Sequence, residues 1–299
     1  MVPHSPVTSP FPAVTLRPMV PSRRDVLRHS LSRGFALAVL PLAGTVQATS
    51  SDGLEAGEVK VPTAAGEIPA YRARPSGDGK RLPVLLVVHE IFGVHEHIKD
   101  LCRRFAKLGY FAIAPELFAR QGDPSKIADI KQLVQEIVSK ASDAQVISDL
   151  DATLAWAAQQ SRADAQRVGI TGFCWGGRIT WLYAAHNPSL KAGVAWYGKL
   201  GGDRDALHPK HALDVVDDLR APVLGLYGGQ DQGITLASIG QMRNALLASK
   251  NTIANRCEFH IYPEAGHAFA ADYRPSYRKP DAEDGFLRLH AWLKAHGAG

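Results

Sequence analysis

From Gly57 onward, short apolar runs alternate with stretches in which apolar residues recur at helical spacing. The run LPVLLVVHE (82–90) is continuous, which is typical of a strand buried on both faces. Similar runs predict strands at 110–116, 167–173, 191–198, 221–229 and 257–264. Helical spacing predicts helices at 97–109, 125–161 with an interruption near Ser142, 175–187, 235–249 and from about Ala282.

Two earlier segments, GEVKVPT and EIPAYRARP, flank a turn at Gly66 and predict an antiparallel hairpin. Together with the six later strands, they indicate an α/β fold with a mostly parallel eight-stranded sheet. Helices on both faces of that sheet would give three layers. The sequence contains no internal repeat and no interdomain linker, so we expect residues 49–299 to form a single domain.

Reactive side chains follow four of the predicted strands. Because functional sites in such sheets form at the carboxyl ends of the strands, Glu90, Cys174, Asp231 and His267 are expected at one edge. Cys174 lies in GFCWG, which has the form of the strand-to-helix turn that presents a nucleophile. The order Cys174, Asp231, His267 is the order of nucleophile, acid and histidine in α/β-hydrolases.

Each of these residue types suits a role in acyl transfer. The helix that follows Cys174 favours a thiolate, because its N-terminus carries partial positive charge. His267 could accept and return a proton, while Asp231 would orient its imidazole ring. The backbone N–H groups of Ile91 and Trp175 are candidates for an oxyanion hole.

Several further residues have two interpretations. Trp175, Trp196 and Tyr197 either line a substrate pocket or pack in the core. Three histidines near Glu90 are expected to be surface or supporting residues rather than metal ligands: His89, His95 and His97. Cys102 and Cys257 are expected to be buried, and the sequence is compatible with a disulfide between them or with two free thiols. No C-x-x-C or H-x-x-x-H spacing indicates a metal, and no metal or organic cofactor is expected.

The positive charge of the chain is concentrated at its start. The formal net charge is +5, yet residues 1–48 contain five arginines and one aspartate. The remainder therefore has no basic surface suited to nucleic acid. Residues 22–27 (SRRDVL) resemble a twin-arginine export signal, and VQA (46–48) resembles a cleavage site.

This interpretation predicts a signal peptide over residues 1–48 and a mature protein from about Thr49, in the periplasm or secreted. The alternative is a disordered basic tail. The apolar stretch is too short for a membrane span, so no membrane association is expected. Translation could start at Met1 or at Met19.

Several segments together resemble the dienelactone hydrolase family, whose members include carboxymethylenebutenolidase-like enzymes. The resemblance covers about residues 57–298 and is carried by HEIFGVHEHIKDLCRRFAKLGY, APELFARQGD, GFCWGGR, WYG, LYGGQD and PEAGHAF. It implies an α/β-hydrolase fold and a triad of Cys174, Asp231 and His267. It also implies that Glu90 hydrogen-bonds the resting thiol and helps to ionise it when substrate arrives.

Two departures from the family pattern concern substrate binding. Ala271 stands where the family's lactonase has an arginine shortly after the catalytic histidine, and Arg274 follows three residues later. The segment that would hold a second arginine has only Lys126 and Lys131. We therefore consider Arg274 and Tyr197 as substrate-binding residues, with Arg274 favouring anionic substrates. In the alternative interpretation, Arg274 is a surface or structural residue paired with Asp272 or Glu283.

The sequence thus predicts an exported hydrolase that cleaves a small ester or lactone through a cysteinyl acyl-enzyme. Its expected partners are that substrate and, for the precursor, the twin-arginine export machinery; a monomer and a dimer are both compatible with the sequence. The main alternative is a binding protein with this fold and no catalysis. A thiol redox protein is disfavoured, because Cys174 has no resolving cysteine near it in the sequence.

Overall fold

The computed structural model describes residues 48–299, so the predicted export motif lies outside the described residues. Eight strands are present: β1 (Leu54–Thr63), β2 (Gly66–Pro75), β3 (Leu82–Val88), β4 (Phe111–Pro115), β5 (Ala163–Phe173), β6 (Leu190–Trp196), β7 (Val223–Gly228) and β8 (Glu258–Tyr262). The α-helices are α2 (Glu96–Lys107), α3 (Ile130–Glu136), α4 (Asp143–Ala158), α5 (Trp175–His186), α6 (Leu236–Ala248) and α7 (Lys279–Ala295).

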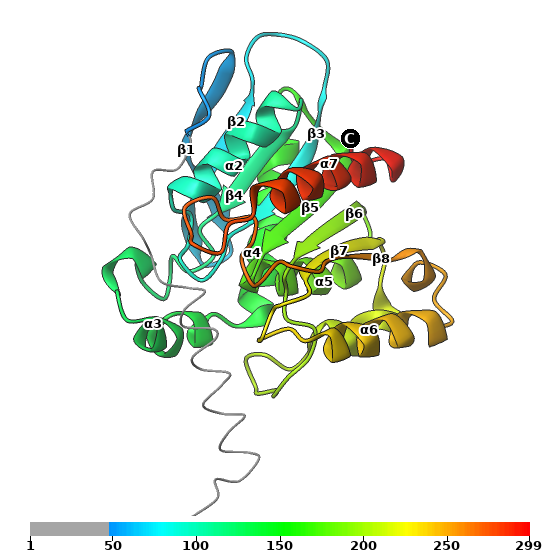
Figure 1. Ribbon diagram of the computed structural model, residues 1–299. Helices are drawn as coiled ribbons and strands as arrows, with labels where there is room; N and C mark the ends of the chain where they lie inside the picture. The colour runs from blue at the N-terminus through cyan, green and yellow to red at the C-terminus, as the bar shows by residue number, and fades with distance from the viewer. Residues whose placement is uncertain (1–47) are drawn as a thin grey trace, which may run out of the picture.

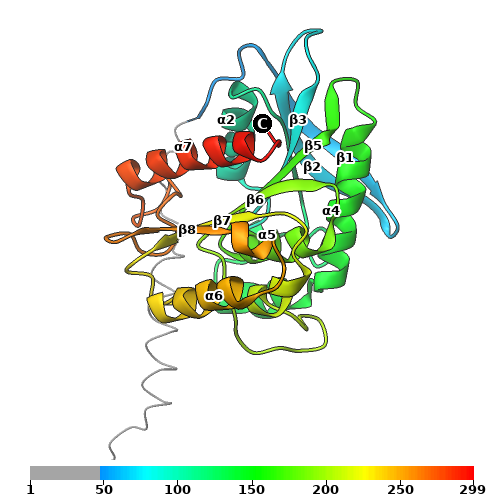
Figure 2. The same cartoon turned by 90° about the vertical axis from the view of Figure 1, so that its right-hand side faces the viewer.

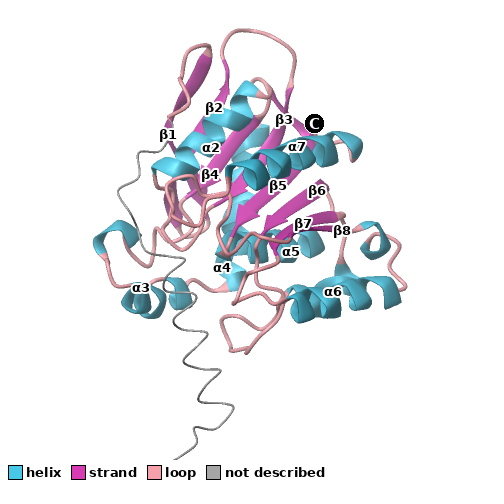
Figure 3. Cartoon of the chain, viewed as in Figure 1, coloured by secondary structure: helices cyan, strands magenta, loops and turns pink. Residues whose placement is uncertain are grey.

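All eight strands form one sheet with the order β1-β2-β4-β3-β5-β6-β7-β8. β1 pairs antiparallel with β2, and β2 pairs antiparallel with β4. The other neighbouring strands are parallel, so their carboxyl ends meet at one edge (Figure 3). This is the edge at which the predicted reactive residues lie.

Helices cover both faces of the sheet (Figures 1 and 2). Helices α2 and α7 share one face, where Phe286 of α7 packs on Phe105 of α2 and on Trp196 of β6. Helices α4 and α5 cover the other face. Strand β3 is buried along its whole length, as its apolar run predicts. The predicted three-layer α/β fold is therefore confirmed.

Two predicted helices have different bounds in the structure. The segment 125–161 holds two α-helices separated by one 3-10 turn, Val138–Lys140. The break at Ser142 is a helix cap whose side chain accepts a hydrogen bond from Gln145 N. Helix α7 begins at Lys279 rather than near Ala282, because Pro280 suits the first turn of a helix. Among residues 48–299, no helix is both long and apolar enough to cross a membrane.

Candidate active site

Cys174 lies in the turn between β5 and α5. Its backbone has φ 55° and ψ −112°, a combination that residues with a side chain rarely adopt. Two glycines allow the strand and helix to approach this closely. A Cβ on Gly172 would lie 2.1 Å from the carbonyl oxygen of Gly176, and one on Gly176 would lie 2.4 Å from that of Val88. The sequence GFCWG therefore forms the sharp turn that its glycines predict.

Positive φ angles at residues other than glycine gather at this edge of the sheet. Within the described part of the chain they occur at Cys174, at Tyr197 and at Ala268. Tyr197 follows β6, and Ala268 follows His267. Such conformations cost about 1–3 kcal/mol each and persist where the surrounding structure fixes them, as commonly happens at functional sites.

His267 and Asp231 come from the loops after β8 and β7. The Nδ1 atom of His267 lies 2.7 Å from the Asp231 Oδ2 atom. The other carboxylate oxygen accepts hydrogen bonds from Gly233 N at 2.8 Å and Ile234 N at 3.1 Å. Asp231 is thus fixed by its own loop and orients the imidazole, whose remaining nitrogen Nε2 is left for Cys174.

The pKa of His267 reflects its two neighbours. Burial by itself would lower this pKa, but the negative charge of Cys174 and the hydrogen bond to Asp231 outweigh burial and raise the pKa to about 10. A hydrogen bond with Cys174 contributes to the shift as well. The structure therefore brings Cys174, His267 and Asp231 together as an acid–histidine–thiol arrangement.

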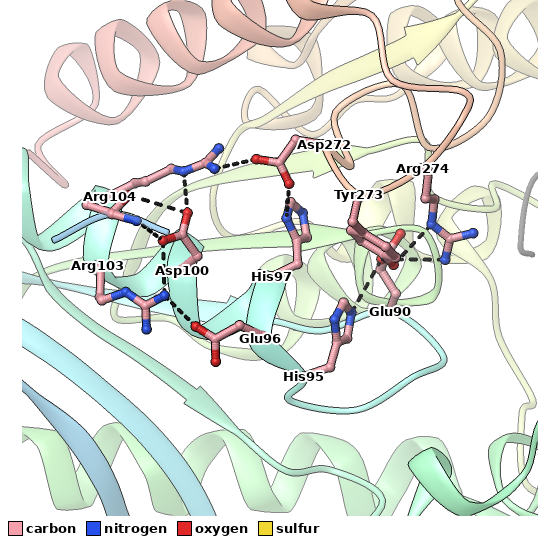
Figure 4. Close-up of polar contacts among 11 residues, drawn as sticks. Glu90, His95, Glu96, His97, Asp100, Arg103, Arg104, Asp272, Tyr273 and Arg274 are labelled. Carbon is pink, nitrogen blue, oxygen red and sulfur yellow. Dashed lines mark hydrogen bonds and ion pairs between the residues drawn. The ribbon is translucent and has the colours of Figure 1, made fainter. Parts of the chain in front are cut away.

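Glu90 is buried beside these residues. Its Oε2 atom accepts a hydrogen bond of 2.8 Å from the Tyr273 hydroxyl and lies 3.8 Å from both Arg274 and His95 (Figure 4). Burial would raise the pKa of Glu90, but the Arg274 guanidinium and His95 hold it well below its usual range. Glu90 is therefore a buried carboxylate, with Tyr273, Arg274 and His95 as its polar contacts.

Arg274 lies in the site rather than on the surface. Its side chain is 2% exposed, and its Nε donates to the Tyr273 hydroxyl at 3.0 Å. Its guanidinium carbon lies 4.9 Å from the centre of the Phe92 ring. The partners considered from the sequence make other pairs, Asp272 with His97 and Glu283 with Lys279.

Tyr197 is fully buried and lies against the imidazole, with ring centres 5.2 Å apart. Its hydroxyl is shielded from solvent and has no hydrogen-bond partner among residues 48–299. Burial, Glu90 and Cys174 raise the pKa of Tyr197 well above its ordinary value, so the hydroxyl keeps its proton. A buried donor without an acceptor is costly, which favours an acceptor supplied from outside the protein.

His89 contacts both segments that hold the predicted oxyanion donors, through the Glu90 carbonyl oxygen and the Trp175 ring. Leu117 N donates to His89 Nε2 at 3.1 Å, so the ring proton is on Nδ1, which lies 2.6 Å from the Glu90 carbonyl oxygen. Because a peptide unit is planar, this contact also orients the N–H of Ile91. The His89 ring stacks on Trp175 with centres 5.4 Å apart. Of the two interpretations that the sequence left open for His89, a surface or a supporting residue, its burial and contacts favour the supporting one.

The other two thiols differ from Cys174. Cys102 and Cys257 are both free; Cys102 is buried as predicted, whereas Cys257 is only partly buried. Burial raises the pKa of the Cys102 thiol far above its ordinary value and that of Cys257 to about 11. The described residues contain no cluster of three or more histidine, cysteine or acidic side chains that could hold a metal ion.

The sequence profile of the dienelactone hydrolase family matches residues 68–297. The chain belongs to this family. It is 62% identical over 277 residues to a putative carboxymethylenebutenolidase of Methylorubrum extorquens, covering 92% of this chain and 94% of that protein. It is 54% identical to a protein of the same description from Escherichia coli K12, with 88% and 96% covered.

A solved structure supports the same assignment. The crystal structure of a putative dienelactone hydrolase from Klebsiella pneumoniae is 56% identical and superposes with a TM-score of 0.77. The match covers 81% of this chain and 98% of that one. As a member of this family, the chain is a hydrolase that acts on ester or lactone bonds and has the α/β-hydrolase fold.

Proposed function

We propose that this hydrolase cleaves a small ester or lactone through a cysteinyl acyl-enzyme, and that it acts after export from the cytoplasm. The observation that carries the catalytic proposal is the Asp231–His267 pair, 2.7 Å apart, with the His267 pKa raised by Cys174. These contacts support a resting ion pair between a thiolate and an imidazolium.

In the first half of the reaction, the Cys174 sulfur attacks the carbonyl carbon of the substrate. A carbon–sulfur bond forms, and the carbonyl oxygen becomes an oxyanion that accepts hydrogen bonds from the N–H groups of Ile91 and Trp175. The tetrahedral intermediate then collapses, the ester carbon–oxygen bond breaks, and His267 donates its proton to the leaving oxygen.

In the second half, His267 takes a proton from a water molecule, which attacks the thioester. The carbon–sulfur bond breaks, the acid product leaves, and the thiolate and imidazolium are restored. Asp231 holds the imidazole ring through both halves and stabilises its cation. The Tyr197 hydroxyl is a fixed donor beside the site and is suited to a substrate oxygen.

Cys174→Ala tests this mechanism, since alanine fits the turn and removes only sulfur. With p-nitrophenyl acetate, wild type should release p-nitrophenol, and mass spectrometry should find one acetyl group on Cys174. Iodoacetamide should inactivate wild type by labelling Cys174, while Cys102 and Cys257 remain unlabelled as internal controls because their raised pKa values keep both thiols protonated. Turnover by the alanine variant would refute the acyl-enzyme and favour a site elsewhere.

A further inference from the structure

The first described residues of the chain rest on helix α2. Lys107 of α2 donates to the carbonyl oxygen of Asp52, which holds this segment against the helix. Thr49 N donates to Asp100 Oδ1 at 2.6 Å, and the Thr49 hydroxyl lies 3.3 Å from Asp100 Oδ2. Asp100 is fully buried, whereas Ala48 is exposed. Along the described chain, exposed Ala48 is therefore followed by half-buried Thr49, whose amide contacts a buried carboxylate.

Asp100 belongs to a cluster of five charged side chains that also includes Glu96, Arg103, Arg104 and Asp272 (Figure 4). This cluster has three carboxylates and only two guanidinium groups. Asp272 also contacts His97 at 3.0 Å, while Asp100 accepts a hydrogen bond from Thr49 N. The amide of Thr49 in an unbroken chain is a donor at this point but carries no charge.

We propose that Asp100 is the binding site for the N-terminal ammonium group of the mature enzyme. The proposal rests on the export function proposed above, with cleavage after Ala48. Hydrolysis of the Ala48–Thr49 bond by a signal peptidase consumes one water, leaving a carboxylate on Ala48 and an ammonium group on Thr49. The new charge lies where Thr49 N already lies, 2.6 Å from a buried carboxylate, and the hydrogen bond between them becomes charge-assisted.

The cluster leads directly to the candidate active site. Arg104 contacts both Asp100 and Asp272, and Asp272 is followed by Tyr273 and Arg274, two of the three residues that make polar contacts with Glu90 (Figure 4). A stronger hydrogen bond between Thr49 and Asp100 therefore also stabilises the segment 272–274, which positions Glu90. Removal of the signal peptide would complete the enzyme as well as release it.

In the test, a protease recognition sequence replaces the residues before Thr49. Cleavage by that protease then makes Thr49 the N-terminal residue. A matched chain is cut to leave Ala48 first, which moves the ammonium group by one residue, about 3.8 Å. Cutting before Thr49 should raise Tm by about 3–6 °C. It should also slow hydrogen exchange in residues 268–277. Cutting before Ala48 should do neither.

Asp100→Asn should lose the gain in Tm on cutting before Thr49. The proposal is overturned if both cuts give the same Tm, if the asparagine variant keeps the gain, or if mass spectrometry of the exported protein finds another first residue. These readouts do not depend on turnover, so a failure of the hydrolase mechanism would leave them unchanged. A failed export mechanism would show instead as a precursor retained with its signal sequence.

Discussion

The residues around Cys174 hold its backbone in a strained conformation with a positive φ angle. Gly172 and Gly176 let strand β5 and helix α5 approach closely, and Cys174 N donates to the carbonyl oxygen of Trp196 at 3.0 Å. The turn therefore lifts the sulfur out of the sheet toward His267. The same strain appears at Ala268, the residue after His267, so both members of the proposed reacting pair are presented by fixed backbone.

The raised pKa of His267 predicts how reactivity depends on pH. The folded value of about 10 lies above the ordinary 6.5, so the imidazolium partner of Cys174 is present throughout the neutral pH range and is lost as the pH rises through about 10. We expect the rate of inactivation by iodoacetamide in wild type to change little between about pH 6 and 8.

His267→Ala provides the comparison. Without the imidazolium, Cys174 should be alkylated slowly at pH 6, and the rate should rise about tenfold per pH unit toward the ordinary thiol pKa near 8.5. Turnover of p-nitrophenyl acetate by this variant should fall by several orders of magnitude. Parallel alkylation profiles in both proteins would show that Cys174 is activated without His267.

The residue types at the site were predictable, but their environments were not. Glycine spacing and chain order identified Cys174, Asp231 and His267, because those signals are local or depend only on strand order. The burial of Arg274 has no local signal. Its carboxylate partner Glu90 is distant in the sequence, and a charged residue in a polar loop is usually exposed.

At the scale of elements, the loop between β8 and α7 determines what meets the substrate. It contains His267 at its start and then Tyr273 and Arg274, which fold back over Glu90. Burial lowers the pKa of Arg274, but the charges of Glu90 and Cys174 raise it. The positive charge of Arg274 therefore lies close enough to interact with Cys174. This supports the proposal that Arg274 favours anionic esters or lactones.

Two variants separate this role from a structural one. Removing Arg274 alone would leave Glu90 as an unpaired buried charge, so Glu90→Gln is compared with the double variant Glu90→Gln/Arg274→Met. The double variant should have a KM about tenfold higher than Glu90→Gln for a carboxylate-bearing ester, because two charge-assisted hydrogen bonds are lost. For a neutral ester of similar size, KM should change less than about twofold. Equal changes for both esters would make Arg274 structural.

Elements with a clear hydrophobic period were predicted close to their observed bounds, and the errors fall where the period is weak. The segment 125–161 reads as one interrupted helix, but its first part forms only α3 and two 3-10 turns. Asp123 and Asp129 cap these short helices through their side chains, which favours several brief turns over one continuous helix. Tertiary contacts then decide the length of each piece.

For the molecule as a whole, sheet order brings the site together from four distant segments. Strands β3, β5 and β7 each deliver one residue to the same edge, and β8 delivers His267, because parallel strands all end there. That inference needs only the order of strands along the chain. The fold and the placement of these four residues at one edge of the sheet could therefore be predicted from the sequence. The charge cluster around Asp100 was not, since it depends on how α2 packs against the β8–α7 loop and the segment before β1.

A prediction about export concerns the whole chain, from its N-terminal motif to the folded domain. Its three cysteines are free in the folded domain, so folding needs no oxidising compartment. Such a domain is suited to twin-arginine export, which transports folded proteins and is indicated by Arg23 and Arg24 in the part of the sequence outside the described residues. Replacing both arginines with lysine keeps the charge and removes the guanidinium groups. We expect esterase activity to move from the periplasmic fraction to the cytoplasm, with the precursor uncleaved. Unchanged periplasmic activity would exclude this export route.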